Sequence, residues 1–143
     1  MNNPGWTLLE LMVVSMILCI GGAVAAGRWV EARAMHQLQS TSRILVADLS
    51  NLRIRAVSLN RPLSLIVGED RVSYGLAERG ATPTRRIELP RGIRFSIVPA
   101  TSLTFYPRAN VAPAGSFVLS SDRAGSIRVV VAPFGRVRWE WIR

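Results

Sequence analysis

A single carboxylate, that of Glu10, stands at the head of a long apolar stretch. No other charged side chain occurs before Arg28. A helix over residues 6–27 has a length of ~33 Å, which is enough to cross the hydrocarbon core of a bilayer. A charge held at the bilayer centre costs about 2.5–3.5 kcal/mol, so an acid in such a segment needs a cationic partner. The neighbouring sequence supplies none, which makes Glu10 a candidate functional residue.

Three interpretations of this segment stay open. In the first, it is a secretory signal peptide with the small-x-small pattern Ala23-Val24-Ala25, although no Lys or Arg precedes the apolar run. In the second, it is a plain membrane anchor, which leaves Glu10 without a partner. In the third, a short leader is removed after Gly5. Trp6 then carries a new amine, and the ammonium of a neighbouring copy becomes the partner that Glu10 needs.

The residues Gly5-Trp6-Thr7-Leu8-Leu9-Glu10 resemble the processing site of type IV pilins and type II secretion pseudopilins. The resemblance implies cleavage between Gly5 and Trp6 by the prepilin peptidase, N-methylation of Trp6, and a role for Glu10 in filament assembly. It also implies a single-pass protein of the bacterial inner membrane with its globular domain in the periplasm and other pilins or pseudopilins as partners. This sequence has Trp6 in place of the usual Phe, and its leader lacks basic residues.

A long helix is expected to continue beyond the apolar segment. From residue 28 to 59, side chains recur at intervals of three and four residues, which predicts an amphipathic helix with one buried face. The opposite face is expected to carry Arg43, Asp48, Asn51 and Arg55, and Asn60-Arg61-Pro62 is expected to end the helix. The expected buried face comprises Leu38, Ser42, Leu45, Leu49, Leu52, Ala56 and Leu59.

The period changes from helical to strand-like after Pro62. Strands are expected at 63–67, 72–76, 86–89, 93–97, 102–106, 116–120, 126–131 and 136–143, with a loop at 107–114. The predicted fold class is α+β: a long, partly transmembrane N-terminal helix packed on a C-terminal antiparallel β-sheet domain, as in the pilin fold. The predicted divisions are a leader (1–5), a transmembrane or filament-core helix (6–27), an amphipathic periplasmic helix (28–61) and a β-rich globular domain (62–143).

Residue types that carry catalysis or hold metals are scarce. Cys19 is the only cysteine and His36 the only histidine, and no phosphate-binding Gly-rich loop occurs. Cys19 is interpreted as an apolar filler and His36 as an exposed helix residue. The adjacent acids Glu69 and Asp70 are interpreted as a solvated turn. The sequence predicts neither an enzyme nor a cofactor, a metal or a small-molecule substrate.

Arginine supplies all of the cationic side chains, because the sequence has no lysine. The sequence has 18 basic and 9 acidic residues, which gives a net charge of +9. Such an excess indicates an anionic partner such as nucleic acid or lipid head groups. In the last strand, Arg136, Arg138 and Glu140 are expected on one face, and Val137, Trp139 and Trp141 on the other. The charged face is either a solvated surface or an anion-binding strip, and the two tryptophans either join the core or stack on bases.

The C-terminal region resembles the GspH/FimT subfamily, which holds the type II secretion pseudopilin H and the FimT-type minor pilin. In the FimT-type branch, a Gly-Arg-x-Arg motif is associated with DNA capture for uptake in natural transformation. The resemblance places that role on Arg136 and Arg138. Arg123, Arg128 and Arg143 are near them in the sequence and are expected to add charge. Two functions therefore stay open, a filament subunit and a DNA-binding minor pilin. The matching segments are Phe105-Tyr106-Pro107, Phe117-Val118-Leu119, Ile127-Arg128-Val129-Val130-Val131 and Gly135-Arg136-Val137-Arg138.

Overall fold

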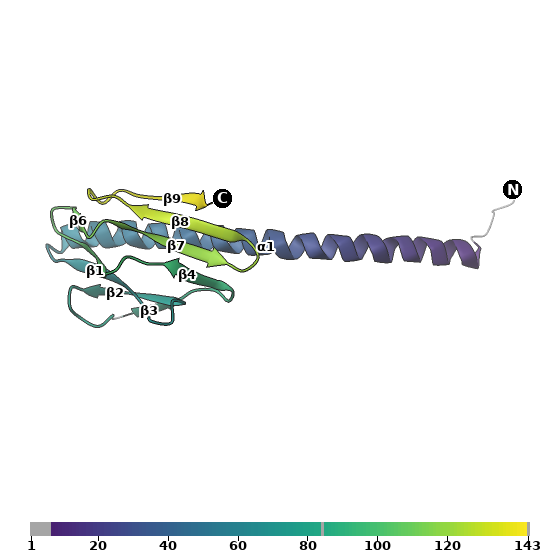
Figure 1. Ribbon diagram of the computed structural model, residues 1–143, viewed down its shortest axis with the longest axis horizontal. Coiled ribbons are helices and arrows are strands. Elements are labelled where there is room, and N and C mark those ends of the chain that lie inside the picture. Colours follow the sequence, from purple (N-terminus) through teal and green to yellow (C-terminus); the bar gives the residue numbers. More distant parts are fainter. Residues whose placement is uncertain (1–6, 84, 143) are drawn as a thin grey trace. The chain divides into compact units, whose positions relative to one another are not determined.

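The computed structural model describes residues 7–83 and 85–142, without the side chains of residues 24–26. The chain divides into two compact units between Arg33 and Ala34. The first unit contains part of helix α1 (Leu8–Ser58), and the second contains the rest of α1 and all of the described strands (Figure 1). The border between the units falls inside the segment expected to be the amphipathic helix 28–61, so most of that segment belongs to the globular unit.

Helix α1 ends where the sequence predicts, and the backbone conformation of Asn60 explains why. Asn60 has a positive φ of 50°, a conformation that asparagine tolerates better than most residues. The N–H of Arg61 donates to the Ala56 carbonyl over 3.2 Å, and the N–H of Asn60 donates to the Val57 carbonyl over 3.3 Å. This pair of bonds defines a Schellman motif, and Pro62 then prevents further helix.

The predicted apolar stripe forms the buried face of α1 in the second unit. Its members from Leu38 to Ala56 are all buried, but Leu59 is 53% exposed because it lies beyond the last helical turn. The expectation that Asp48 lies on the solvent face was wrong. Asp48 is half-buried and accepts a hydrogen bond from the Tyr74 hydroxyl. Burial and this bond to the carboxylate raise the pKa of Tyr74, so the phenol remains a donor at neutral pH.

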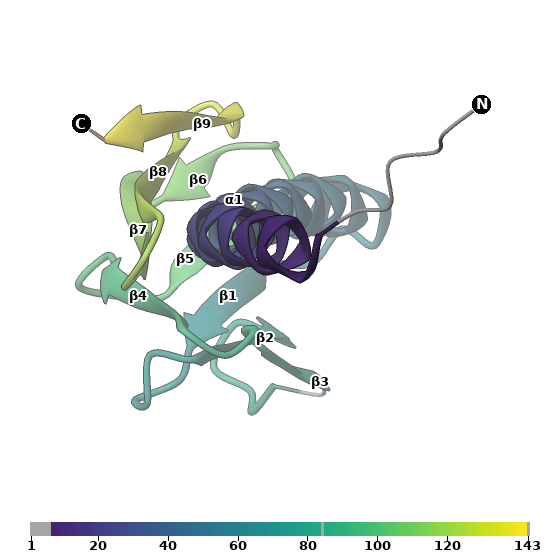
Figure 2. The same cartoon turned by 90° about the vertical axis from the view of Figure 1, so that its right-hand side faces the viewer.

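The strands form two antiparallel sheets in the second unit, and they curve around one side of the helix (Figure 2). The first sheet has the order β3-β2-β1-β5-β6, and the second has the order β4-β7-β8-β9. The first comprises β1 (Leu63–Val67), β2 (Ser73–Glu78), β3 (Arg85–Glu88), β5 (Leu103–Phe105) and β6 (Val111–Ala112). The second comprises β4 (Ile93–Ile97), β7 (Gly115–Ser121), β8 (Gly125–Val131) and β9 (Val137–Ile142).

This topology corrects two expectations. The helix stripe was expected to pack on one sheet, but the chain changes sheets after β3, because β3 pairs with β2 whereas β4 pairs with β7. The segment 107–114 was expected to be a loop, but it contains the short strand β6, which pairs with β5. The antiparallel α+β class itself is confirmed.

An aromatic contact joins the two sheets inside the core. Phe95 on β4 is fully buried, and its ring meets Tyr74 on β2 edge-to-face, with centroids 6.2 Å apart. A second edge contact, at 6.0 Å, joins Phe95 to Phe117 on β7. Because Tyr74 also bonds to Asp48 on α1, this cluster ties both sheets and the helix together.

Candidate functional site

Helix α1 begins with a capping arrangement around Glu10. The N–H of Glu10 donates to the Thr7 carbonyl over 3.0 Å and approaches Thr7 Oγ1 at 3.3 Å. A threonine just before a helix and a glutamate three residues later are the signature of a capping box, a signal that was available in the sequence. The Glu10 carboxylate is exposed and forms no ion pair with any residue that the structure describes. Its charge is therefore not neutralised within the described chain.

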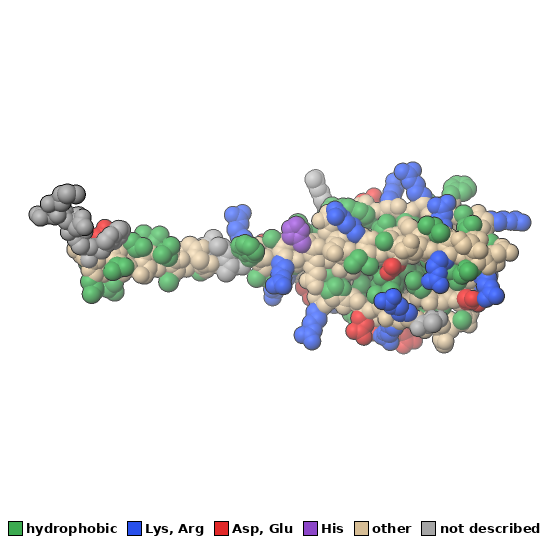
Figure 3. Space-filling view, turned by 180° about the vertical axis from the view of Figure 1, so that it is seen from behind, with side chains coloured by type: hydrophobic (Ala, Val, Ile, Leu, Met, Phe, Trp, Pro, Cys, Tyr) green, Lys and Arg blue, Asp and Glu red, His purple; other side chains and the backbone are tan. Residues whose placement is uncertain are grey.

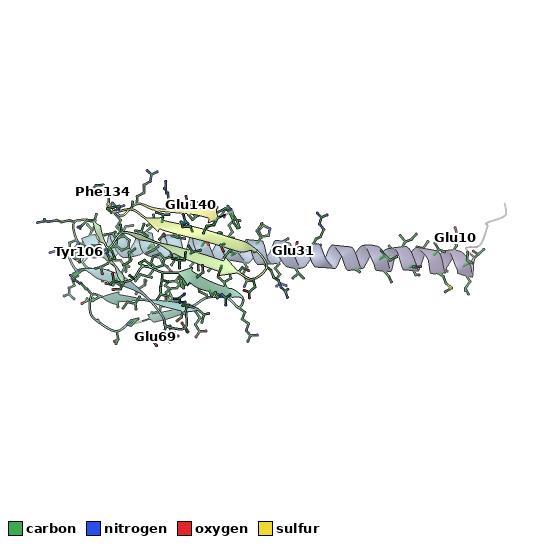
Figure 4. The ribbon with its side chains drawn as sticks, in the orientation of Figure 1. Glu10, Glu31, Glu69, Tyr106, Phe134 and Glu140 are labelled. Atoms are coloured by element: carbon green, nitrogen blue, oxygen red, sulfur yellow. The ribbon has the colours of Figure 1, made fainter. Side chains whose placement is uncertain are left out.

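The first turns of α1 present an apolar surface that the described residues leave exposed. Leu8 is 79% exposed, Met16 is 66% exposed and Leu18 is 69% exposed. The helix is long and apolar enough to cross a membrane. Figure 4 shows Glu10 on this part of the helix. An uncovered apolar surface of this size marks an interaction with lipid or with another chain.

Three predicted site residues, Gly5, Trp6 and Arg143, lie outside the described residues. The structure places Arg128 on β8, Arg138 on β9 and Arg136 in the turn between these strands. The C-terminal arginines are thus distributed over two different surfaces, the outer face of the sheet and its end.

On the outer face, one arginine is paired and another is not. Arg128 lies opposite Glu140 in the ladder, and Arg138 lies opposite Val130. The Arg128 guanidinium is 3.6 Å from the Glu140 carboxylate, so this pair is partly neutralised. Arg138 forms no ion pair within residues 7–83 and 85–142. β9 is also an edge strand, since its one described neighbour is β8.

The two tryptophans of β9 differ in exposure. Trp139 is half-buried and packs against the hydrophobic core, whereas Trp141 is 40% exposed. The aromatic face of the strand is therefore only partly absorbed by the core.

A tight turn places Arg136 at the end of the second sheet. The N–H of Gly135 donates to the Ala132 carbonyl over 2.8 Å, and the N–H of Ala132 donates to the Arg136 carbonyl over 2.9 Å. Pro133 begins the turn, and Gly135 has a φ of 73°, which is typical of a three-residue hairpin loop with a left-handed last residue. The turn is attached to β6, because the Val111 N–H donates to the Pro133 carbonyl over 2.9 Å.

Arg53 of α1 packs directly against this turn. A Cβ atom built on Gly135 lies 2.8 Å from Arg53 Nε and 2.8 Å from the Ala109 carbonyl oxygen. Arg53 and Arg136 line a common groove of ≈ 500 Å³. Sequence reasoning missed this pair, because the two residues are far apart in the chain and only the tertiary fold brings them together. The other lining residues are Ser50, Ile54, Val57, Ser58, Ala109, Gly135 and Val137.

The close packing at Gly135 gives a testable difference between two glycines. Gly125 has a similar φ of 83° but open space around its Cα, so Gly125→Ala incurs only the backbone cost, about 1–2 kcal/mol. Gly135→Ala adds a clash with Arg53 and Ala109, and we expect a total loss of about 2–4 kcal/mol. Urea unfolding of the full-length chain in mild detergent measures both free energies. Equal losses contradict the close packing of Gly135 against Arg53 and Ala109.

A second groove, of ≈ 560 Å³, lies between α1 and strands β2 and β3 and has a balanced lining. Asp48 and Glu78 line it together with Arg55 and Arg85. Within the described part of the chain, no group of three or more His, Cys, Asp or Glu side chains is placed to hold a metal ion. Of the two grooves, the one at Arg53 and Arg136 carries the uncompensated charge.

No family model and no curated protein matches the sequence. Solved structures do match. The minor pseudopilin EpsH of the type 2 secretion system of Vibrio cholerae aligns with a TM-score of 0.60 at 12% identity, over 73% of this chain and 97% of that chain. The type IV minor pilin FimU of Pseudomonas aeruginosa strain PAO1 aligns with a TM-score of 0.61 at 23% identity, over 73% of this chain and 89% of that chain.

These likenesses establish the fold class. The chain has the fold of type IV pilin-like proteins, a long N-terminal helix packed on antiparallel sheets. The two matched structures are both described as minor subunits, one of a secretion system and one of a pilus.

Proposed function

We propose that this chain is a minor pilin or pseudopilin, a subunit of a filament of the type II secretion or type IV pilus kind. The observation that carries the proposal is the exposed apolar surface at the start of α1, whose residues find no partner in the described chain. A bilayer covers that surface before assembly, and the helices of neighbouring subunits cover it in the filament. The protein is anchored in the bacterial inner membrane by one span, with the globular unit in the periplasm, and acts mechanically rather than as an enzyme.

The assembly step uses Glu10. The prepilin peptidase cleaves between Gly5 and Trp6 and the Trp6 amine is methylated, so that Glu10 becomes the fifth residue of the mature chain. Its carboxylate then pairs with the ammonium at Trp6 of the neighbouring subunit. The support for this step is that the Glu10 carboxylate is exposed and forms no ion pair with a described residue.

The mass of the mature N-terminus tests this proposal. We expect N-terminal peptides from purified filaments, or from membranes, to begin at Trp6 with a methylated amine. A chain that begins near Ala26 is instead a secreted protein released by signal peptidase, and a chain that keeps Met1 is a plain anchor. Either of these two results refutes processing at Gly5.

A second candidate function is DNA capture by the C-terminal arginines Arg128, Arg136, Arg138 and Arg143. Its support is the exposed Arg138 on the outer face of β9, which forms no ion pair with a described residue. The partly exposed Trp141 lies on the opposite face of the same strand. On the face of the second unit in Figure 3, arginine side chains outnumber acidic ones and are spread widely. Arg128 is the weakest member of the set, because Glu140 already neutralises part of its charge.

The salt dependence of DNA binding tests the second function. Each phosphate contact adds ~0.9 to the slope of log affinity against log salt concentration. We expect Arg136→Gln combined with Arg138→Gln to lower that slope by about 2. Arg61→Gln is the matched control, because Arg61 is exposed but paired with Glu78 over 3.1 Å. Binding that is independent of salt, or equally weakened by the control, rules out capture by these two arginines.

A further inference from the structure

We propose that the groove between α1 and the β8–β9 turn binds a phosphate of single-stranded nucleic acid between Arg53 and Arg136, with a base stacked on Phe134. This inference rests on the DNA-capture candidate and deepens it. It names the form of the ligand, and it assigns a binding residue, Arg53, that lies on the helix rather than in the C-terminal motif.

The charge of the groove selects an anion. Arg53 and Arg136 both line it, and no acidic residue does. Neither arginine forms an ion pair with a residue that the structure describes. The nearby groove at β3 contains as many carboxylates as guanidinium groups, so it offers an anion no net attraction. Arginine forks suit phosphate oxygens in particular, because their N–H groups form paired hydrogen bonds.

Close packing against the turn confines one of the two arginines. The side chain of Arg53 lies against Gly135, where its Nε and Cδ atoms leave no room for a Cβ. Arg53 is also half-buried, unlike the exposed Arg136. A long side chain that is already confined loses less conformational entropy when it binds. Arg53 therefore acts as the fixed side of the site and Arg136 as the mobile side.

The apolar parts of the surface favour a nucleotide over a free anion. Ile54 is 61% exposed and Val57 is 47% exposed, and both line the groove beside the two arginines. Phe134, at the tip of the turn, is 82% exposed, and Figure 4 shows it at the same end of the unit as Tyr106. Phe134 does not itself line the groove, but it directly precedes the lining residues Gly135 and Arg136 in the turn. Exposed aromatic rings combined with cationic grooves are the usual platform for the bases of a single strand. The bases of a duplex are stacked on one another and do not offer their faces to such a ring.

Fluorescence anisotropy of the full-length chain in neutral detergent tests the site with three probes. These are a labelled oligothymidine, a labelled duplex, and inorganic phosphate as competitor. We expect Arg53→Gln to weaken oligothymidine binding about tenfold, and Arg53→Lys to restore part of it. Phe134→Ala is expected to weaken oligothymidine binding about fivefold or more and to leave duplex binding unchanged. Arg55→Gln, two positions along the same helix in the balanced groove, is expected to change it less than about twofold.

The outcomes separate this inference from the function on which it rests. If Arg53→Gln binds like the unaltered chain while the Arg136 and Arg138 double variant does not, DNA capture stands and the groove is refuted. If the unaltered chain binds neither nucleic acid, both fail. If Phe134→Ala leaves oligothymidine binding unchanged, base stacking on Phe134 is refuted. If the labelled duplex binds and is displaced by inorganic phosphate while oligothymidine does not bind, the groove does not select a single strand, and that ligand is overturned. Thermal melts show that each variant remains folded.

Discussion

Glu10→Gln is expected to remove the subunit from filaments while leaving its amount in the membrane unchanged. Truncating one partner of a desolvated charge pair costs about 2–5 kcal/mol, which corresponds to a loss of incorporation of ~30-fold or more. The glutamine keeps the size and the capping-box chemistry of the glutamate, so the helix start remains intact. The fraction of the subunit in sheared filaments, relative to the membrane fraction, measures the effect.

Thr7→Ala is the matched control for this prediction. It removes the hydroxyl that accepts from the Glu10 N–H, at a cost of about 0.5–2 kcal/mol of helix stability, but it keeps the carboxylate. If Thr7→Ala and Glu10→Gln reduce incorporation equally, Glu10 acts through the helix start and not through its charge. If Glu10→Gln is incorporated into filaments at the normal level, the proposed charge pairing is refuted.

Phe95→Ala is expected to lower the free energy of unfolding of the globular unit by about 3–5 kcal/mol. The ring is fully buried, and it contacts Tyr74 on one sheet and Phe117 on the other. Its removal therefore leaves a cavity at the junction of the two sheets. Urea unfolding of the full-length chain, followed by far-ultraviolet circular dichroism, measures the loss.

Two further variants serve as controls for the Phe95 prediction. Ile97→Ala, on the same strand, changes a side chain that is 53% exposed and is expected to cost less than about 1 kcal/mol. Phe95→Leu keeps most of the volume and is expected to cost about 1–2 kcal/mol, which remains measurable if Phe95→Ala does not fold. Equal losses for Phe95→Ala and Ile97→Ala contradict a junction held by this ring.

Local sequence patterns predicted the local features of the fold. The apolar spacing from Leu38 to Ala56 identified the buried face of α1, and Asn60-Arg61-Pro62 identified its end. Strands β1 and β4 have the predicted bounds, because their alternation and their flanking turn residues lie within a few positions of each other.

Long-range pairing was beyond those patterns. Nothing near β3 or β4 indicates that one pairs with β2 and the other with β7, because the choice depends on packing over α1. The two-residue strand β6 is too short to have a period. Asp48 was assigned to solvent for the same reason, since its partner Tyr74 belongs to a strand that only the tertiary fold brings near.

In the candidate site, too, local features could be predicted from the sequence and long-range ones could not. The residues Thr7 and Glu10 are neighbours in sequence, so the acid at the head of the apolar helix could be found without a structure. The groove at Arg136 could not, because its second cation lies on α1 and its shape depends on the turn at Gly135. Sequence alone therefore emphasised Arg136 with Arg138, whereas the structure places Arg136 beside Arg53.

The position of β9 at the margin of its sheet also affects how purified protein behaves. An unpaired margin invites association with other chains, and charged side chains on it keep the protein dispersed. Arg138 and Glu140 are the charged residues of β9 and are both exposed. Neutralising Arg138 to test DNA capture therefore also weakens a safeguard against aggregation. Light scattering should accompany the DNA titration, because aggregation of the variant lowers the measured binding just as the loss of a DNA contact does.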